Sequence, residues 1–303
     1  MDERPDPVAG AGELLIRVRA AGINGADLLQ RAGAYPAPAG SPADIPGLEL
    51  AGEVVALGAG AGRFQIGDRV MAIVGGGGQA ELAVVHERQV MPVPQNLDWP
   101  RAGGLPEVFT TAHDAIFTQC GLLAGERLLV HGGAGGVGTA AVQIGMAAGA
   151  HVTATVRSPE LRDAVRALGA DAVLDPEDFV GSGPFDVILE LVGAPNMAGN
   201  IKAVNTDGRI VVIGVGAGFK AEVNLLALMG KRAALRGSTL RARPLEEKAM
   251  TARAVERSVL PHFESGAIDV PLAELFPLES VSDAYEHFKA GGKLGKIVLT
   301  IEG

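Results

Sequence analysis

Cysteine is nearly absent from this sequence, which has one among 303 residues, and tyrosine and tryptophan are almost as scarce. One thiol cannot form an internal disulfide or a four-cysteine zinc site. Disulfide-stabilised secreted scaffolds and cysteine-rich zinc modules are therefore excluded. A lone Cys120 is typical of a reducing compartment, and we predict a cytoplasmic protein.

The sequence also lacks an excess of positive charge. Its 26 lysines and arginines face 35 aspartates and glutamates, which gives a formal net charge of −9. A long anionic polymer would be repelled, so we expect no nucleic-acid partner, although a local basic pocket could still hold one phosphate. We expect no membrane span either, because the uncharged stretch Gly132–Ala150 gathers glycines at its start, as a buried strand, loop and helix would.

What is present changes in character along the chain. The first hundred residues are rich in predicted strands and loops, with strands over Leu14–Val18 and Glu53–Leu57, a short helix over Asp27–Arg31, and a tight turn at Gly75–Gly78.

After about Leu105, strands alternate with helices. The predicted strands are 127–131, 151–156, 172–174, 186–190 and 209–214, and the predicted helices are 137–148, 159–168 and 196–204. This alternation predicts a doubly wound α/β fold of the Rossmann type, with a parallel sheet between helices. The end of the chain, with helices over 246–265 and 281–290 and a strand over 296–301, is expected to pack back on the first domain.

The segment RLLVHGGAGGVG (residues 127–138) carries the strongest chemical signal. Gly133, Gly135 and Gly138 have the spacing of a dinucleotide-binding loop, which needs a tight turn, close approach of pyrophosphate to backbone, and close helix–strand packing. The helix that follows offers free N–H groups to phosphates. Because the loop stands between a predicted strand and a predicted helix, we interpret it as a nicotinamide dinucleotide site of an oxidoreductase.

The second strand of this unit bears on which dinucleotide is bound. NAD enzymes usually place a carboxylate after that strand for the ribose 2′-hydroxyl. Here Arg157 and Ser158 follow Val156, and these side chains suit a 2′-phosphate. We therefore predict NADPH as the cofactor, with a preference over NADH that Arg157→Glu abolishes. The alternative is that Arg157 is simply an exposed residue at a strand end.

Several ordered motifs give the chain a resemblance to the medium-chain dehydrogenase/reductase superfamily over nearly its whole length. They are GINGADLLQR (22–31), IPGLELAGEVVALG (45–58), IGDRVMA (66–72), HGGAGGVGTAAVQ (131–143) and LGKIVL (294–299). The resemblance is to zinc-free, zeta-crystallin-like quinone oxidoreductases, and NGADLLQRAGAYPAP (24–38) and LPEVFTTAHDA (105–115) are most similar to the tumour-suppressor-induced quinone reductase branch. It implies a discontinuous, β-rich GroES-like catalytic domain of residues 1–106 and 243–303 and a Rossmann domain of residues 107–242.

Zinc is not expected. Zinc-dependent members ligate the metal with Cys and His, whereas the motif usually written G-H-E reads Gly47-Leu48-Glu49 here, and Cys120 has no second cysteine. The six histidines show no ligand spacing and are interpreted as surface or packing residues. No metal site is predicted.

The resemblance also assigns site residues. Asn24 and Tyr35 are the candidate catalytic residues at the substrate end, with a loop tyrosine and a turn-capping asparagine as the plainer interpretations. The candidate cofactor-binding residues, together with Arg157 and Ser158, are Thr111, Ala134, Gly135, Gly136, Val137, Gly214, Val215, Gly216, Thr239, Leu240 and Lys296, with Ser238 beside them. Leu161 and Asp175 stand where relatives carry lysine and tyrosine or histidine, which shifts the 2′-phosphate contact to Arg157 and Ser158.

The implied activity is zinc-independent, NADPH-dependent hydride transfer to a quinone. Two alternatives stay open: reduction of the C=C bond of an enone or enoyl thioester, and a non-enzymatic NADPH-sensing or RNA-binding role. A homodimer is expected, with Val223–Met229 either the edge strand of its interface or a buried core segment. The sequence also begins later than its relatives, by about one strand, so we expect that strand to be missing from the first sheet.

Overall fold

The computed structural model describes residues 2–302, which divide into two compact units. The first unit runs to Thr110 and also includes Leu240–Gly291 and the chain from Lys296. The second comprises Thr111–Thr239 and Gly292–Gly295. The boundaries between the two units therefore lie a few residues from those predicted at 106/107 and 242/243. The short segment 292–295 also belongs to the second unit.

The first unit is built on a seven-stranded sheet. Its central strand, β1 (Glu13–Gly22), pairs antiparallel with β2 (Glu49–Leu57), β4 (Leu82–His86) and β13 (Lys296–Thr300). The path β12-β13-β1-β2-β3-β5 includes β12 (Leu272–Pro277), β3 (Arg69–Ile73) and β5 (Met91–Pro92). The C-terminal strand thus lies beside the N-terminal one in a single sheet, with Leu14, Ile16 and Leu299 in the same core.

Helices complete this unit. Those of the first part of the chain are α1 (Gly25–Arg31), α2 (Trp99–Gly104) and the first residues of α3 (Pro106–His113), within which the unit boundary falls. Those of the last part are α9 (Leu245–Ser258), α10 (Leu260–Glu264) and α11 (Val281–Ala290). The single helix predicted over 246–265 is wrong in one respect, because it is interrupted at Val259. Pro261 has no N–H to continue the helical ladder, so a new helix begins at Leu260.

The second unit is a parallel six-stranded sheet in the order β11-β10-β9-β6-β7-β8. Its strands are β6 (Arg127–Val130), β7 (His151–Thr155), β8 (Ala172–Leu174), β9 (Phe185–Glu190), β10 (Val204–Val212) and β11 (Ala234–Gly237). The order reverses between β6 and β9, which is the switch point at which doubly wound sheets bind ligands. This arrangement confirms the predicted fold class: a Rossmann sheet accompanied by a separate β-rich unit.

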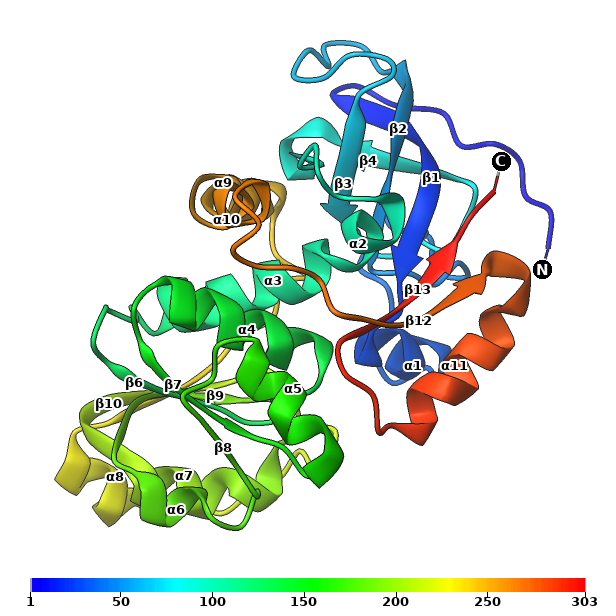
Figure 1. Cartoon of the computed structure of the whole chain (residues 1–303). Coiled ribbons are helices and arrows are strands. Elements are labelled where there is room, and N and C mark those ends of the chain that lie inside the picture. Colours follow the sequence, from blue (N-terminus) through cyan, green and yellow to red (C-terminus); the bar gives the residue numbers. More distant parts are fainter. Residues whose placement is uncertain (1, 303) are drawn as a thin grey trace. The chain divides into compact units, whose positions relative to one another are not determined.

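Helices cover both faces of this sheet. Figure 1 shows α4 (Gly136–Ala147) and α5 (Arg162–Ala167) on one face, and α6 (Phe179–Ser182), α7 (Met197–Ala203) and α8 (Leu225–Lys231) on the other. Burial on two faces explains why β6 is apolar after Arg127, with Leu128, Leu129 and Val130 fully buried. Short helical turns complete the chain: η1 (Glu87–Gln89), η2 (Asp114–Gln119), η3 (Pro159–Leu161), η4 (Ala194–Asn196) and η5 (Leu278–Ser280).

The segment Val223–Met229 differs from both interpretations given to it. Most of it belongs to helix α8, whose Leu226 and Met229 are exposed, so it is neither an edge strand nor a core segment. The Asn224 side chain accepts a hydrogen bond from the Ala227 N–H (3.0 Å) and caps the helix. The edge strands of the sheet are instead β11 and β8.

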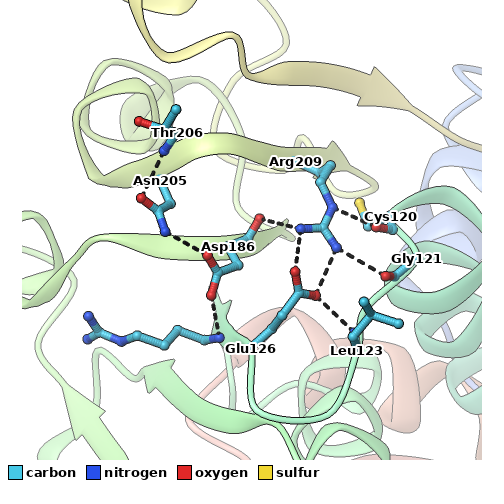
Figure 2. Close-up of polar contacts among 9 residues, drawn as sticks. Cys120, Gly121, Leu123, Glu126, Asp186, Asn205, Thr206 and Arg209 are labelled. Carbon is cyan, nitrogen blue, oxygen red and sulfur yellow. Dashed lines mark hydrogen bonds and ion pairs between the residues drawn. The ribbon is translucent and has the colours of Figure 1, made fainter.

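A polar cluster joins the elements at the end of this sheet where the parallel strands begin, opposite to the end with the glycine loop (Figure 2). The Arg209 guanidinium donates to both carboxylate oxygens of Glu126, at 2.8 Å each. It also donates to the carbonyl oxygens of Cys120 (2.7 Å) and Gly121 (3.1 Å). Asp186 accepts from the Arg127 N–H and from Asn205. The cluster ties the loop before β6 to β9 and β10.

Across residues 2–302, every helix is too short or too polar to span a lipid bilayer.

Candidate functional site

The glycine loop follows β6 at the switch point and leads into α4. Gly133 and Gly138 are required by packing, because a Cβ on Gly133 would lie 2.8 Å from the Ala154 Cβ on β7. A Cβ on Gly138 would lie 2.2 Å from the Gly132 carbonyl oxygen. Both distances are far inside normal contact, so these two glycines allow α4 to approach the sheet closely.

Gly135 differs from them. It is exposed, and a Cβ there would meet no protein atom closer than the Gly132 oxygen at 3.4 Å. Gly135 is also the N-cap of the twelve-residue helix α4, and it provides no side-chain cap. The first N–H groups of a helix have no intrahelical partner and attract anions. The bare backbone at Gly135 therefore fits a pyrophosphate, and Ala134, Gly136 and Val137 belong to the same turn.

The Ala134 carbonyl oxygen accepts a hydrogen bond from the Gly295 N–H (2.8 Å). The short segment 292–295 is therefore part of the same unit as the loop, which the sequence did not predict.

Arg157 and Ser158 follow β7, as predicted. Arg157 is exposed and makes no hydrogen bond or ion pair with any described residue, and Ser158 is half-buried. The side chain of the neighbouring Arg162 is already hydrogen-bonded within the protein, since it donates to Asp175 at 2.6 Å and to the Val156 carbonyl. A backbone hydrogen bond from Glu177, assisted by Arg162, keeps the pKa of Asp175 below its usual value. Arg157 is thus the arginine of this turn with its donors available.

The segment Gly214–Gly216 follows β10 in the same unit. A Cβ on Gly214 would lie 2.3 Å from the Leu191 carbonyl oxygen, so this glycine lets the turns after β9 and β10 touch. Val215 and Gly216 are exposed.

The remaining candidates of this unit differ in exposure. Thr111 is buried, Ser238 donates to Asp114 (3.0 Å), and Thr239 is exposed.

The first unit contains a buried polar cluster around Asn24. The Asn24 Nδ2 donates to Glu49 Oε1 (2.9 Å), and its Oδ1 accepts from the Lys296 Nζ (2.7 Å). Lys296 Nζ also lies 2.7 Å from Glu49 Oε1 and donates to the Ile23 carbonyl (2.8 Å). The three protons of Lys296 therefore all have protein partners, and Asn24 is held between a cation and an anion.

Asp27 lies beside this cluster, one turn along α1. Its carboxylate accepts from the Asn24 N–H (2.8 Å) and the Gly47 N–H (3.3 Å). Burial raises the pKa of Asp27 to about 7, against the opposing hydrogen bond from Asn24 and the charge of Lys296. Sequence reasoning missed both Asp27 and Glu49. The glutamate of the Gly47-Leu48-Glu49 motif was a usable signal, because it stands beside the position of the lost histidine.

Tyr35, the second candidate catalytic residue, is half-buried and stacks against Arg241, whose guanidinium lies 4.9 Å from the ring centroid. Arg241 also donates to the Tyr35 carbonyl (2.9 Å), to Gly75 and to Gln30. Burial raises the pKa of the Tyr35 phenol, so the hydroxyl stays protonated. Arg241, missed by sequence reasoning, thus holds the Tyr35 loop.

Leu240 lies in this first unit and lines a small, largely apolar cavity together with Met91, Thr110 and Lys248. The Thr110 hydroxyl is buried without a hydrogen-bond partner among the described residues.

Within residues 2–302, no group of three or more His, Cys, Asp or Glu side chains is arranged to hold a metal ion. Cys120 is a buried free thiol, and burial raises its pKa to about 11.

Comparison with known proteins identifies the family. Residues 10–95 match the alcohol dehydrogenase GroES-like domain, and residues 136–256 match the zinc-binding dehydrogenase family. The chain is 30% identical over 306 residues to a quinone oxidoreductase of Rattus norvegicus, an alignment that covers 97% of this chain and 91% of that protein.

Solved structures agree with this. An alcohol dehydrogenase superfamily protein from Novosphingobium aromaticivorans superimposes with a TM-score of 0.88 at 29% identity, covering 99% of this chain and 95% of that one. A mycobacterial protein in complex with NADPH superimposes with a TM-score of 0.87 at 27% identity, covering 99% and 94%. The chain is therefore an oxidoreductase of the medium-chain dehydrogenase/reductase superfamily, related to the zeta-crystallin-like quinone oxidoreductases.

Proposed function

We propose that this oxidoreductase is a zinc-independent, NADPH-dependent reductase of quinones. The observation that carries the proposal is the bare backbone of Gly135 at the start of α4, at the switch point of a parallel sheet. Steric demands of the protein explain Gly133 and Gly138 but leave Gly135 unexplained, and a pyrophosphate that touches the backbone there explains it. The relationship to quinone oxidoreductases supports the choice of acceptor.

NADPH is proposed over NADH because of the charges after β7. Residues 156–158, which follow β7 directly, have no carboxylate to accept from a ribose 2′-hydroxyl; the next one is Glu160 in η3, and the nearby Asp175 is paired with Arg162. Arg157 has free donors for a 2′-phosphate, with the Ser158 hydroxyl beside it. The similar mycobacterial structure is a complex with NADPH, which supports the same choice.

The bound cofactor would supply the hydride, and the protein would bind and orient the acceptor in a dry pocket. Tyr35 is the proposed hydrogen-bond donor to the acceptor oxygen, since its protonated hydroxyl makes no hydrogen bond with the described residues. Asn24 is proposed to line the same site, with its amide orientation fixed by Glu49 and Lys296. We expect Tyr35→Phe to lower kcat/KM, and unchanged kcat/KM in both Tyr35→Phe and Tyr35→Ala would remove Tyr35 from the site.

Turnover with a panel of acceptors tests the activity itself. NADPH oxidation is followed with benzoquinones and naphthoquinones, with enals, and with enoyl thioesters. The proposal expects the highest kcat/KM with a quinone, in protein that contains no stoichiometric metal. Turnover confined to enals or enoyl thioesters would replace quinone reduction by C=C reduction, and stoichiometric zinc would overturn the metal-free mechanism.

The proposal includes a cytoplasmic homodimer. Strand β11 is one of the two edges of the six-stranded sheet, and helix α8, which precedes it in the chain, exposes Leu225, Leu226 and Met229. An unpaired edge and an apolar patch favour association with a second copy. The net negative charge supports a small-molecule substrate over a nucleic acid as the protein's partner.

A further inference from the structure

A continuous series of hydrogen-bonded, buried polar side chains lies at the switch point of the second unit. His131 follows β6, Thr155 ends β7, Glu190 ends β9, and Asn200 projects from α7. All four are at most 1% exposed. The large majority of buried polar groups in proteins are hydrogen-bonded, and here each of the four is bonded to the next.

The bonds of this series run in one direction. Glu190 Oε2 accepts from the Asn200 Nδ2 (2.7 Å), because a carboxylate can only accept. The other end of that amide, Oδ1, therefore faces His131 Nε2 at 2.7 Å and needs a donor. His131 must carry its proton on Nε2, which leaves Nδ1 to accept from the Thr155 hydroxyl at 3.1 Å.

Each end of this hydrogen-bonded series, Glu190 and Thr155, is bonded to a backbone turn. Glu190 Oε1 accepts from the N–H groups of Val192 (2.7 Å) and Gly193 (2.8 Å). That turn packs against Gly214, which approaches the Leu191 carbonyl. At the opposite end, the Gly132 N–H points at the Thr155 hydroxyl oxygen (3.4 Å), and the Gly133 N–H donates to the Thr155 carbonyl (2.9 Å).

We propose that Thr155, His131, Asn200 and Glu190 are positioning residues that couple the glycine loop to the turn supporting Gly214, through a hydrogen-bond relay with one fixed direction. The inference rests on the proposed function, since it takes the glycine loop and Gly214 as parts of the dinucleotide site. Burial lowers the pKa of His131, against the opposing charge of Glu190, and the ring packs edge-on against Phe179 at 4.6 Å. The neutral ring is thus a fixed connector, with its tautomer set by Asn200.

The tautomer of His131 is directly measurable in the cofactor-free full chain. Nitrogen-15 NMR separates a protonated from an unprotonated ring nitrogen, and comparison with His131→Gln identifies the His131 signals. The relay requires a protonated Nε2 and an unprotonated Nδ1. A protonated Nδ1 with a bare Nε2 would overturn it, and this measurement is made on the unmodified network.

Glu190→Gln tests whether the direction is transmitted. The amide oxygen introduced at position 190 must serve the Val192 and Gly193 N–H groups, which turns the new NH2 toward Asn200. Asn200 must then rotate its amide, present NH2 to His131, and move the His131 proton to Nδ1. A folded Glu190→Gln protein that keeps the Nε2 proton would refute the relay.

Thr155→Val tests the coupling to the cofactor, with Thr153→Val as the matched control on the same strand and face. The Thr153 hydroxyl makes no hydrogen bond with the described residues. Loss of the Thr155 hydroxyl should weaken NADPH binding roughly 3- to 10-fold, the usual effect of one hydrogen bond, while Thr153→Val leaves it unchanged. Equal affinities of the two variants would sink the coupling. If the unmodified protein binds no NADPH, the proposed function fails, while the NMR result still decides whether the relay exists.

Discussion

Gly135 and Gly138 belong to one loop, but the structure predicts opposite consequences for an added methyl group. In Gly138→Ala the new Cβ would stand 2.2 Å from the Gly132 oxygen and 2.8 Å from the Gly133 Cα. Both are backbone atoms, so the start of α4 must move away from the turn at Gly132 and Gly133. Overpacking of this kind costs about 1–3 kcal/mol of unfolding free energy.

In Gly135→Ala the new Cβ has ordinary contact distances, and the backbone angles of φ −73° and ψ 168° are open to alanine. The loss of a glycine N-cap costs about 0.5 kcal/mol. The methyl group would occupy the space proposed for pyrophosphate, however, and we expect NADPH affinity to fall at least 10-fold, or about 1.4 kcal/mol.

The assay combines thermal unfolding, followed by far-ultraviolet circular dichroism, with calorimetric titration of NADPH. Gly230→Ala is the control, because Gly230 in α8 has open space around its Cα and lies outside the loop. Gly138→Ala should lose stability and affinity together, whereas Gly135→Ala should lose affinity with a stability cost of only about 0.5 kcal/mol. Undiminished NADPH binding in Gly135→Ala would refute the assignment of the loop.

Three further outcomes are expected. Arg209→Leu leaves the Glu126 carboxylate without its bidentate partner (Figure 2) and should lower the free energy of unfolding in urea by about 2 kcal/mol. Arg166→Ala removes only an exposed ion pair within a helix and should cost at most about 0.5 kcal/mol. Equal losses in the two variants would contradict this difference. Since burial raises the pKa of Asp27 from 3.8 to about 7, the folded state binds a proton more tightly than the unfolded chain, and stability should decline as pH rises through this window; Asp27→Asn should flatten that decline, and an unchanged profile would count against the burial effect. Met229→Asp should convert a dimer to a monomer in sedimentation experiments, and an unaltered dimer would move the interface elsewhere.

Local signals in the sequence were sufficient for much of the second unit. The helix predicted over Val137–Ala148 is observed as Gly136–Ala147. The apolar strand and the spaced glycines mark its start, and Gly149, with φ 79°, follows its C-cap. Short apolar runs were harder, since periodicity alone does not separate helix from strand. The apolar run that begins at Val223 forms a helix from Leu225, because the Asn224 side chain caps it.

The site divides in the same way. Candidate residues can be proposed from spacing where they are glycines or follow a strand, and these include the proposed cofactor contacts Gly135 and Arg157. Arg241 could not be found in this way, because its partners Tyr35, Gly75 and Gln30 are brought to it by the fold. The relay is the clearest case, as 69 residues separate His131 from Asn200.

The central claim is that the loop at Gly133–Gly138 holds NADPH, with Arg157 on the 2′-phosphate. The ratio of the NADH to the NADPH dissociation constant, measured by equilibrium titration of the full chain, tests it most directly. We predict a ratio of at least about 10 for the unmodified protein, worth about 1.4 kcal/mol, and a ratio near one or below in Arg157→Glu. Equal affinities for the two cofactors in the unmodified protein would contradict it.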